Sequence, residues 1–304
     1  MNLNKHVSKL LFVALLFLIS FASCEQKNNE TITSPSDAPW PITSYNFGGL
    51  QELGPKAQID LLHSTGYDGI ILKSATKEDF QDLDEAIAAA ESLSDFKIDA
   101  IFERYNFGDD PERRERWKEV VDKISGKDIQ LWVIFGKKME GITDTFIENK
   151  LREIVTYAAP KNVEVILYPH SSCYLESAEE ALPFVDKINH PNLNLAFHLY
   201  HEVRAKNGHR IDEVIAKVSH RLGAVTLAGT DTIADYSSPL ARDTSTIKPL
   251  GRGNYDLNNF IAILNEANYK GSVGFMNFAI KEDPGIYLPR SVKVWEVYNE
   301  NGGE

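Results

Sequence analysis

The chain has 304 residues, of which 43% are hydrophobic and 25% are charged, a composition typical of a globular protein with a sizeable core. Its 44 acidic residues outnumber its 32 basic ones, and the formal net charge of -12 argues against nucleic acid as a partner. The two cysteines, Cys24 and Cys173, cannot form the disulfide framework of a small secreted protein.

Residues 1–23 have the pattern of an export signal. Lys5 and Lys9 precede an apolar run at residues 10–19, which is too short to span a bilayer comfortably. The tetrapeptide at residues 21–24, Phe-Ala-Ser-Cys, resembles the signal box of bacterial lipoproteins. That resemblance implies cleavage before Cys24, lipidation of its thiol and a place on a bacterial membrane, on the periplasmic or outer-membrane side; the alternative is a plain secretory signal.

Residues 24–39 are polar and rich in Ser, Asn and Pro, which predicts a flexible tether. We expect the folded domain to occupy residues 40–304. Removal of residues 1–23 takes away two lysines and no acidic residue, so the mature chain would carry a net charge of about -14.

Eight apolar stretches of strand length follow in chain order. They are residues 44–48, 69–73, 98–103, 130–136, 163–168, 193–197, 224–228 and 272–278. Between most of them the apolar residues recur at intervals of three and four, and several of these segments begin with Thr, Ser, Asp or Pro, as helices do. Apolar strands separated by helices indicate a parallel sheet covered on both faces, and eight such units predict a single (β/α)8 TIM barrel of the α/β class.

A doubly wound open sheet is the competing architecture. Its marker would be a glycine-rich phosphate loop after the first strand, with the spacing G-x-G-x-x-G. The sequence there, "FGGLQELGP", lacks that spacing, so we favour the barrel. The repeating unit is interrupted at residues 229–256, a long polar loop of the kind that is usually functional or disordered.

Three histidines lie at the ends of the fifth and sixth predicted strands, where TIM barrels carry their reactive groups. Tyr168 and His170 are two residues apart and would share one face of a strand, and His198 and His201 could turn into the same site. Neutral imidazoles bind divalent metals, so His170, His198 and His201 are candidate ligands for Zn, Mn or Mg. Alternatively, each histidine is an ordinary hydrogen-bonding residue at a strand end.

Other polar residues at strand ends complete the candidate site. The candidate catalytic residues are Tyr168, His170, His201, Lys73 and Glu103. The candidate substrate-binding residues are Arg204, Glu202, Asp231 and Asn277. Lys73 could equally be a cation whose stem lies along apolar surface, and Glu103 could form an ion pair with Arg104 at the rim.

The segments "EVILYPHSSCYLESAEEALPFVDKINHPNLNLAFHLYHEVRA", "AVTLAGTDT" and "IKPLGRGNYDLNNFIAILNEANYKGSVGFMNF" resemble the sugar phosphate isomerase/epimerase family of xylose isomerase-like TIM barrels. The resemblance implies a sugar substrate and a divalent metal held by Glu, Asp, His and Glu. Those four positions correspond to Tyr168, His198, Thr226 and a residue near Met276 or Asn277, so none of the four ligands is retained. Two further histidines of the family match His170 and His201.

This departure changes the expected chemistry. A subset of the family with a Y-x-H element occurs in exported bacterial proteins and is linked to breakdown of 3-keto-glycosides. The sequence therefore predicts an enzyme resembling a sugar isomerase or epimerase, or a 3-keto-glycoside lyase or hydrolase. It would act by acid/base proton transfer on a sugar or keto-glycoside, with metal assistance as one route. The alternative is a carbohydrate-binding lipoprotein that has lost the metal site.

Overall fold

The computed structural model describes residues 40–301, with side chains up to residue 298. The predicted export signal, the lipidation site at Cys24 and the predicted tether lie outside the described residues. In the described part of the chain, no helix is both long enough and apolar enough to cross a membrane.

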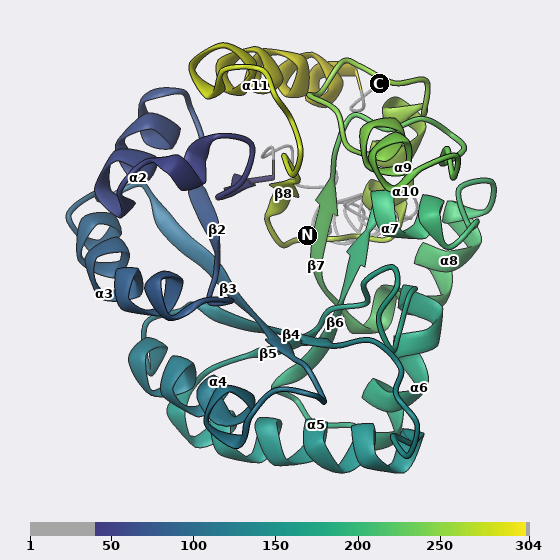
Figure 1. The fold of residues 1–304 in the computed structure, drawn as a ribbon. Coiled ribbons are helices and arrows are strands. Elements are labelled where there is room, and N and C mark those ends of the chain that lie inside the picture. The colour runs from purple at the N-terminus through teal and green to yellow at the C-terminus, as the bar shows by residue number, and fades with distance from the viewer. Residues whose placement is uncertain (1–39, 302–304) are drawn as a thin grey trace, which may run out of the picture. The chain divides into compact units, whose positions relative to one another are not determined.

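Eight parallel strands close into a barrel, so the predicted fold class is confirmed (Figure 1). Each strand bonds to the next along the chain, and the ring is completed where Ile42 and Ser44 lie opposite Val273 and Phe275. The strands are β1 (Ile42–Tyr45), β2 (Gly69–Lys73), β3 (Lys97–Tyr105), β4 (Gln130–Phe135), β5 (Val165–Leu167), β6 (Leu193–His198), β7 (Leu222–Leu227) and β8 (Val273–Phe275).

Helices surround the barrel, and most begin with a side-chain cap. Thr76, Asp110, Thr143, Ser177 and Asp256 each accept a hydrogen bond from a backbone N–H in the first turn of the following helix. In the described residues the α-helices are α2 (Pro55–Ser64), α3 (Lys77–Glu91), α4 (Pro111–Ile124), α5 (Asp144–Ala158), α6 (Ala178–Ile188), α7 (Leu199–Arg204), α8 (Ile211–Val218), α9 (Pro239–Thr246), α10 (Leu257–Glu266) and α11 (Pro284–Asn301).

The first strand ends three residues before its predicted end because the backbone turns there. Gly48 has φ +62°, and a Cβ at this position would lie 2.5 Å from the hydroxyl of Tyr287 and 2.6 Å from the carbonyl oxygen of Asn277. Only glycine fits this left-handed turn against the last strand's loop. The long loop after β7, predicted as polar and irregular, contains the short helix α9.

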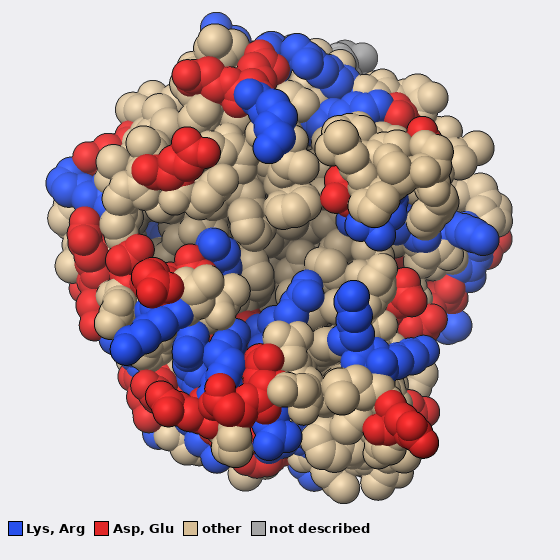
Figure 2. Space-filling view, in the orientation of Figure 1, with Lys and Arg blue, Asp and Glu red and all other residues tan. Residues whose placement is uncertain are grey.

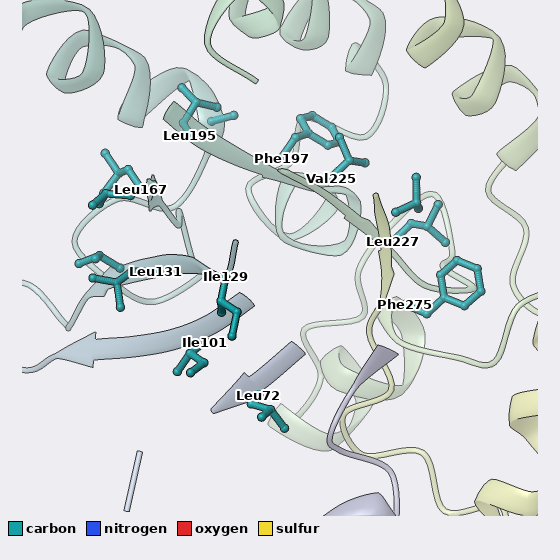
Figure 3. Close-up of a cluster of buried hydrophobic side chains, with 14 of the residues drawn as sticks. Leu72, Ile101, Ile129, Leu131, Leu167, Leu195, Phe197, Val225, Leu227 and Phe275 are labelled. Carbon is teal, nitrogen blue, oxygen red and sulfur yellow. The ribbon is translucent and has the colours of Figure 1, made fainter. Parts of the chain in front are cut away.

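Alternating side chains of the strands form two apolar layers. Outward-facing residues such as Leu72, Ile101 and Leu195 pack between the strands and the surrounding helices (Figure 3). Inward-facing residues, among them Ile71 and Trp132, fill the inside of the barrel. The inside of the barrel is thus a packed core and not a channel.

Candidate functional site

A cavity of about 400 Å³ lies where the strands run out into their loops, at the carboxyl mouth of the barrel. Figure 2 shows a hollow at the centre of the ring with basic side chains around it. The cavity is lined by Phe47, Phe102, Arg104, Ile134, Lys137, Tyr168, His170, Ser171, Ser172, Cys173, Tyr200, His201, Arg204, Arg242, Asp243, Ile247, Met276 and Phe278. Aromatic rings and basic groups therefore share one pocket.

Hydroxyl groups converge on the floor of this cavity. The hydroxyl of Tyr168 lies 3.1 Å from those of Tyr45 and Tyr200, and Thr226 donates to Tyr200 at 3.1 Å. Nδ1 of His198 lies 2.6 Å from Oγ1 of Thr226. Burial raises the pKa of Tyr45, Tyr168 and Tyr200, so all three phenols are neutral at pH 7.

His170 and His201 form the side of the cavity above this floor, with ring centroids 4.2 Å apart. Burial, followed by the positive charges of Arg104, Arg204 and Arg242, lowers the pKa of His170 to about 3. Burial and the neighbouring histidines also hold the pKa of His201 well below its usual value. Both rings are therefore uncharged at pH 7.

His198 occupies a different place from the other two histidines. Its ring stacks against Tyr168 at a centroid distance of 3.7 Å, and it lies below the cavity wall with 1% of its surface exposed. Burial lowers its pKa, so it too is neutral. Of the predicted site residues, the cavity brings together Tyr168, His170, His201 and Arg204.

The remaining predicted site residues point elsewhere. Lys73 pairs with Asp79 at 3.1 Å, and Glu103 bonds to Arg113 and Ser74, so the expected pair of Glu103 with Arg104 does not form. Asp231 pairs with Lys248, and Asn277 donates to Ser44 and Tyr287. Glu202 accepts hydrogen bonds from the backbone N–H of Ala178 and from Asn207, on the helix side of α7. These five side chains do not line the cavity.

The predicted metal ligands are not assembled as a metal site in the described part of the chain. Among residues 40–298, no three His, Cys, Asp or Glu side chains converge as a ligand set. Tyr168, His198 and Thr226, which stand at the positions expected for metal ligands, are bonded to one another or to neighbouring hydroxyls. Metal binding by His170, His198 and His201 therefore stays a prediction, which the arrangement of these three side chains does not support.

Four charged residues that line the cavity were outside the predicted site. Arg104, considered only as part of a rim ion pair, places Nη2 3.4 Å from Nε2 of His170. Lys137 follows β4, and Arg242 and Asp243 are on α9. The sequence could have indicated Arg104 and Lys137, since both stand at or just after the ends of predicted strands, where TIM barrels carry their functional residues. No such indication existed for α9, because the path of a long loop cannot be read from its sequence.

A closed parallel barrel with its cavity at the carboxyl mouth is the architecture of the TIM-barrel enzymes. The sequence matches the xylose isomerase-like TIM barrel family over residues 59–287, more than half of the chain, and the chain belongs to that family.

Individual relatives are more distant. An L-ribulose 3-epimerase of Methylomonas sp. (strain DH-1) is 26% identical over 149 residues, which are 48% of this chain; the chain matches only about half of that protein, 46% of its length. The 3-keto-D-glucoside 4-epimerase of E. coli is similar in structure, with a TM-score of 0.64 and 16% identity over 85% of this chain and 99% of that one. A structure of the IolI protein with a bound zinc atom has a TM-score of 0.63 and 15% identity over 86% of this chain and 97% of that one.

Proposed function

We propose that this chain is an enzyme of the sugar isomerase/epimerase kind that moves a proton on a carbon next to a sugar carbonyl. The observation that carries this proposal is the pair of neutral rings, His170 and His201, 4.2 Å apart in the wall of the mouth cavity. The family and the epimerases among the relatives support the reaction class.

Hydrogen bonds assign complementary tautomers to the two rings. Nδ1 of His170 lies 2.7 Å from the carbonyl oxygen of Ser171, so Nδ1 carries the hydrogen and Nε2 is the acceptor nitrogen, 3.4 Å from Nη2 of Arg104. The backbone N–H of Ser171 donates to Nδ1 of His201 at 3.5 Å, which places the hydrogen of His201 on Nε2. One ring can thus accept a proton while the other can donate a hydrogen bond.

The reaction follows from these roles. Nε2 of His170 takes the proton from the carbon beside the carbonyl, and the electron pair of that C–H bond forms the double bond of an enediolate. Negative charge then develops on the former carbonyl oxygen. The guanidinium of Arg104, within contact of Nε2 of His170, and the N–H of His201 are placed to stabilise this charge. Return of the proton to the former carbonyl carbon, with transfer of the remaining hydroxyl proton from one oxygen to the other, gives an isomer. Protonation of the original carbon on its opposite face, with release of the proton on His170 to solvent, gives an epimer.

The low pKa of His170 keeps its ring unprotonated at pH 7, so that Nε2 can accept a proton, but it also makes the ring a weak base. Stabilisation of the enediolate by Arg104 therefore has to supply much of the driving force. A 3-keto-glycoside eases this requirement, because the ketone acidifies the proton on C2. Such substrates, whose proton loss can also lead to glycoside cleavage, belong in the assay beside simple ketoses.

Proton transfer can be measured before the natural substrate is known. Purified protein is incubated in D2O with a panel of ketoses and 3-keto-glucosides, and NMR records deuterium entering the carbon next to the carbonyl. We expect exchange with at least one sugar, and a decrease of at least about 100-fold in the His170→Gln variant, since a general base contributes on that order. His209→Gln, which changes an exposed histidine between α7 and α8, is the matched control.

Binding of a sugar without exchange in any member of the panel would contradict catalysis. That outcome would support the second candidate, a carbohydrate-binding protein, which the lack of a converging metal ligand set among the described residues also favours.

A further inference from the structure

We propose that Tyr168 carries the proton that moves between the two oxygens of the enediolate when the enzyme forms an isomer. This inference rests on the proposed function, because the transfer follows removal of the carbon-bound proton by His170. That first step leaves one oxygen of the enediolate as an anion and the other as a hydroxyl, and an isomer forms only if the hydroxyl proton changes places. The second transfer therefore needs a group that can give one proton and take another.

Five hydrogen-bonding groups form a single chain at the floor of the cavity. In order, they are His198, Thr226, Tyr200, Tyr168 and Tyr45, with 2.6 Å at the first link and 3.1 Å at each of the other three. The contacts of Tyr200 with Tyr45 and with Nδ1 of His198 are 3.5 Å long and correspondingly weak. Of the five side chains, Tyr168 and Tyr200 line the cavity.

A count of hydrogens along this chain leaves one for a ligand. Each of the four hydroxyls carries one hydrogen, and Nδ1 of His198 supplies a fifth, because Thr226 uses its own hydrogen to donate to Tyr200. Tyr45 donates to Tyr168 at the other end. Either hydroxyl can donate between Tyr168 and Tyr200, so the hydrogen left over belongs to one of these two phenols. When Tyr200 donates, the hydrogen of Tyr168 is available to a substrate oxygen.

Burial requires the phenol to stay neutral during the transfer. Tyr168 is 3% exposed and Tyr200 is fully buried, and a lone charge in such a place is costly. Tyr168 avoids a charge if it gives its hydrogen to the anionic oxygen of the enediolate while it takes the hydrogen of the neighbouring hydroxyl. One O–H bond of Tyr168 breaks and another forms, so one proton passes between the substrate oxygens and the phenol ends as it began.

The electron pairs then complete the isomer. The oxygen that has lost its proton forms the new carbonyl, and the electron pair of the carbon–carbon double bond takes the proton held on Nε2 of His170. Atoms and charge balance without a further reactant. Formation of an epimer needs no transfer between oxygens, so the role of Tyr168 is confined to the isomer.

The ring of Tyr168 is held firmly for this task. His198 stacks against it at a centroid distance of 3.7 Å, and Trp132 and Phe102 meet it in T-shaped contacts at 5.8 and 6.2 Å. The phenol oxygen therefore keeps its position while only hydrogens move, which is the preorganisation that proton transfer requires.

Two rates measured on one sugar separate this role from that of His170. A sugar from the panel that exchanges deuterium is incubated again, and NMR records both the exchange at carbon and the formation of the isomeric sugar. Tyr168→Phe keeps the ring and removes the hydroxyl. We expect isomer formation by this variant to fall about 100-fold, while exchange stays within about threefold of the parent protein.

Two further variants test the chain and the specificity of the effect. Tyr45→Phe removes the donor behind Tyr168, outside the cavity wall, and should slow isomer formation roughly threefold to tenfold, the effect of one neutral hydrogen bond. Tyr67→Phe is the matched control, because its hydroxyl is also buried but donates to the carbonyl oxygen of Leu288 at 3.4 Å, away from the cavity. It should leave both rates unchanged, and thermal melts confirm that each variant is folded.

Three results would overturn the inference: unchanged isomer formation in Tyr168→Phe, equal loss of exchange and isomer formation in the folded variant, or exchange by the parent protein without any isomer. If Tyr168→Phe does not fold, Tyr45→Phe decides, because an unchanged rate of isomer formation in that variant contradicts the chain. Failure of the proposed function is a different result: the parent protein then exchanges deuterium with no sugar of the panel, and the inference falls with it.

Discussion

His170 lies among three arginine side chains, and these neighbours decide which charge its ring can carry. The residue is a plain strand-end histidine in the sequence, with an expected pKa near that of a free imidazole. In the folded chain, burial and the charges of Arg104, Arg204 and Arg242 make it a weak base. Those arginines are 34 or more residues away along the chain, so the chemical character of His170 could not be predicted from its local sequence.

Glu202 is a second residue whose titration depends on burial. Its side chain is 1% exposed, and burial raises its pKa to about 7 despite hydrogen bonds from Ala178 and Asn207. It stands in α7, directly after His201. The sequence suggested a substrate-binding carboxylate here, whereas the structure places this carboxyl at the N-terminus of α6, where it ties α6 to α7.

Stability should therefore depend on this carboxyl between about pH 4.5 and 7. The unfolded chain releases the proton of Glu202 first, while the folded chain still holds it, so the free energy of unfolding falls as pH rises through that window. The loss is on the order of 3 kcal/mol, at 1.36 kcal/mol per pKa unit. Urea denaturation at several pH values should show that Glu202→Gln removes this slope and leaves the variant at least as stable as the parent above pH 7. An unchanged slope would count against the raised pKa.

At the level of elements, a buried ion pair fastens helix α4 to the barrel. Glu103 in β3 is 2% exposed and bonds to Arg113 in α4 and to Ser74 after β2. Its side chain faces the helices, while the next residue, Arg104, lines the cavity. One strand thus supplies a structural charge on one face and a ligand-binding charge on the other, as the alternation of side chains along a strand requires.

Breaking this pair should destabilise the barrel. Arg113→Leu leaves the carboxylate of Glu103 buried with only the Ser74 hydroxyl, and we expect a loss of about 3 kcal/mol in the free energy of unfolding. Arg152→Leu removes an exposed arginine that pairs with Glu148 on α5, and should cost less than about 1 kcal/mol. Chemical denaturation of both variants provides the comparison, and equal losses would show that burial of Glu103 has no special weight.

Elements differ in how well the sequence predicts them. The bounds of β2 agree with the predicted strand. Its sequence is a continuous apolar run that ends at a charged residue, Lys73. By contrast, β5 and β8 are each three residues long, and Tyr168 and Asn277 lie beyond them. Helix α9 was missed because Thr246 alone among its residues is buried, so it lacks an apolar stripe. Its Arg242 and Asp243 are therefore the part of the site that sequence patterns could not supply.

On the scale of the whole molecule, the basic cavity is an exception within an acidic protein. The exposed face in Figure 2 carries both signs of charge, yet the hollow at its centre is edged mainly by basic groups. The charges are therefore unevenly distributed, and a concave site edged by basic groups attracts anions although the chain as a whole is acidic. The net charge alone does not show this local excess of basic groups at the mouth.

Anchoring remains a prediction from residues 1–24. We expect the full-length protein made in a bacterial host to sediment with membranes, and Cys24→Ala to move it to the soluble fraction, since the thiol that would carry the lipid is gone. Cys173→Ala, which changes a buried cysteine in the cavity wall, is the matched control and should leave the partition unchanged. Membrane association of the Cys24→Ala protein would contradict lipidation at this residue.

The pairing of β1 with β8 has a consequence for how the chain reaches its native state. Strand β1 pairs with β8, so the barrel cannot close until residues 273–275 have been synthesised. Until then β1 and the newest strand each present an unpaired backbone edge, and such edges pair readily with other chains. Aggregation through these edges is therefore a hazard during synthesis, and chain truncations at either end of the barrel should expose the same edges permanently.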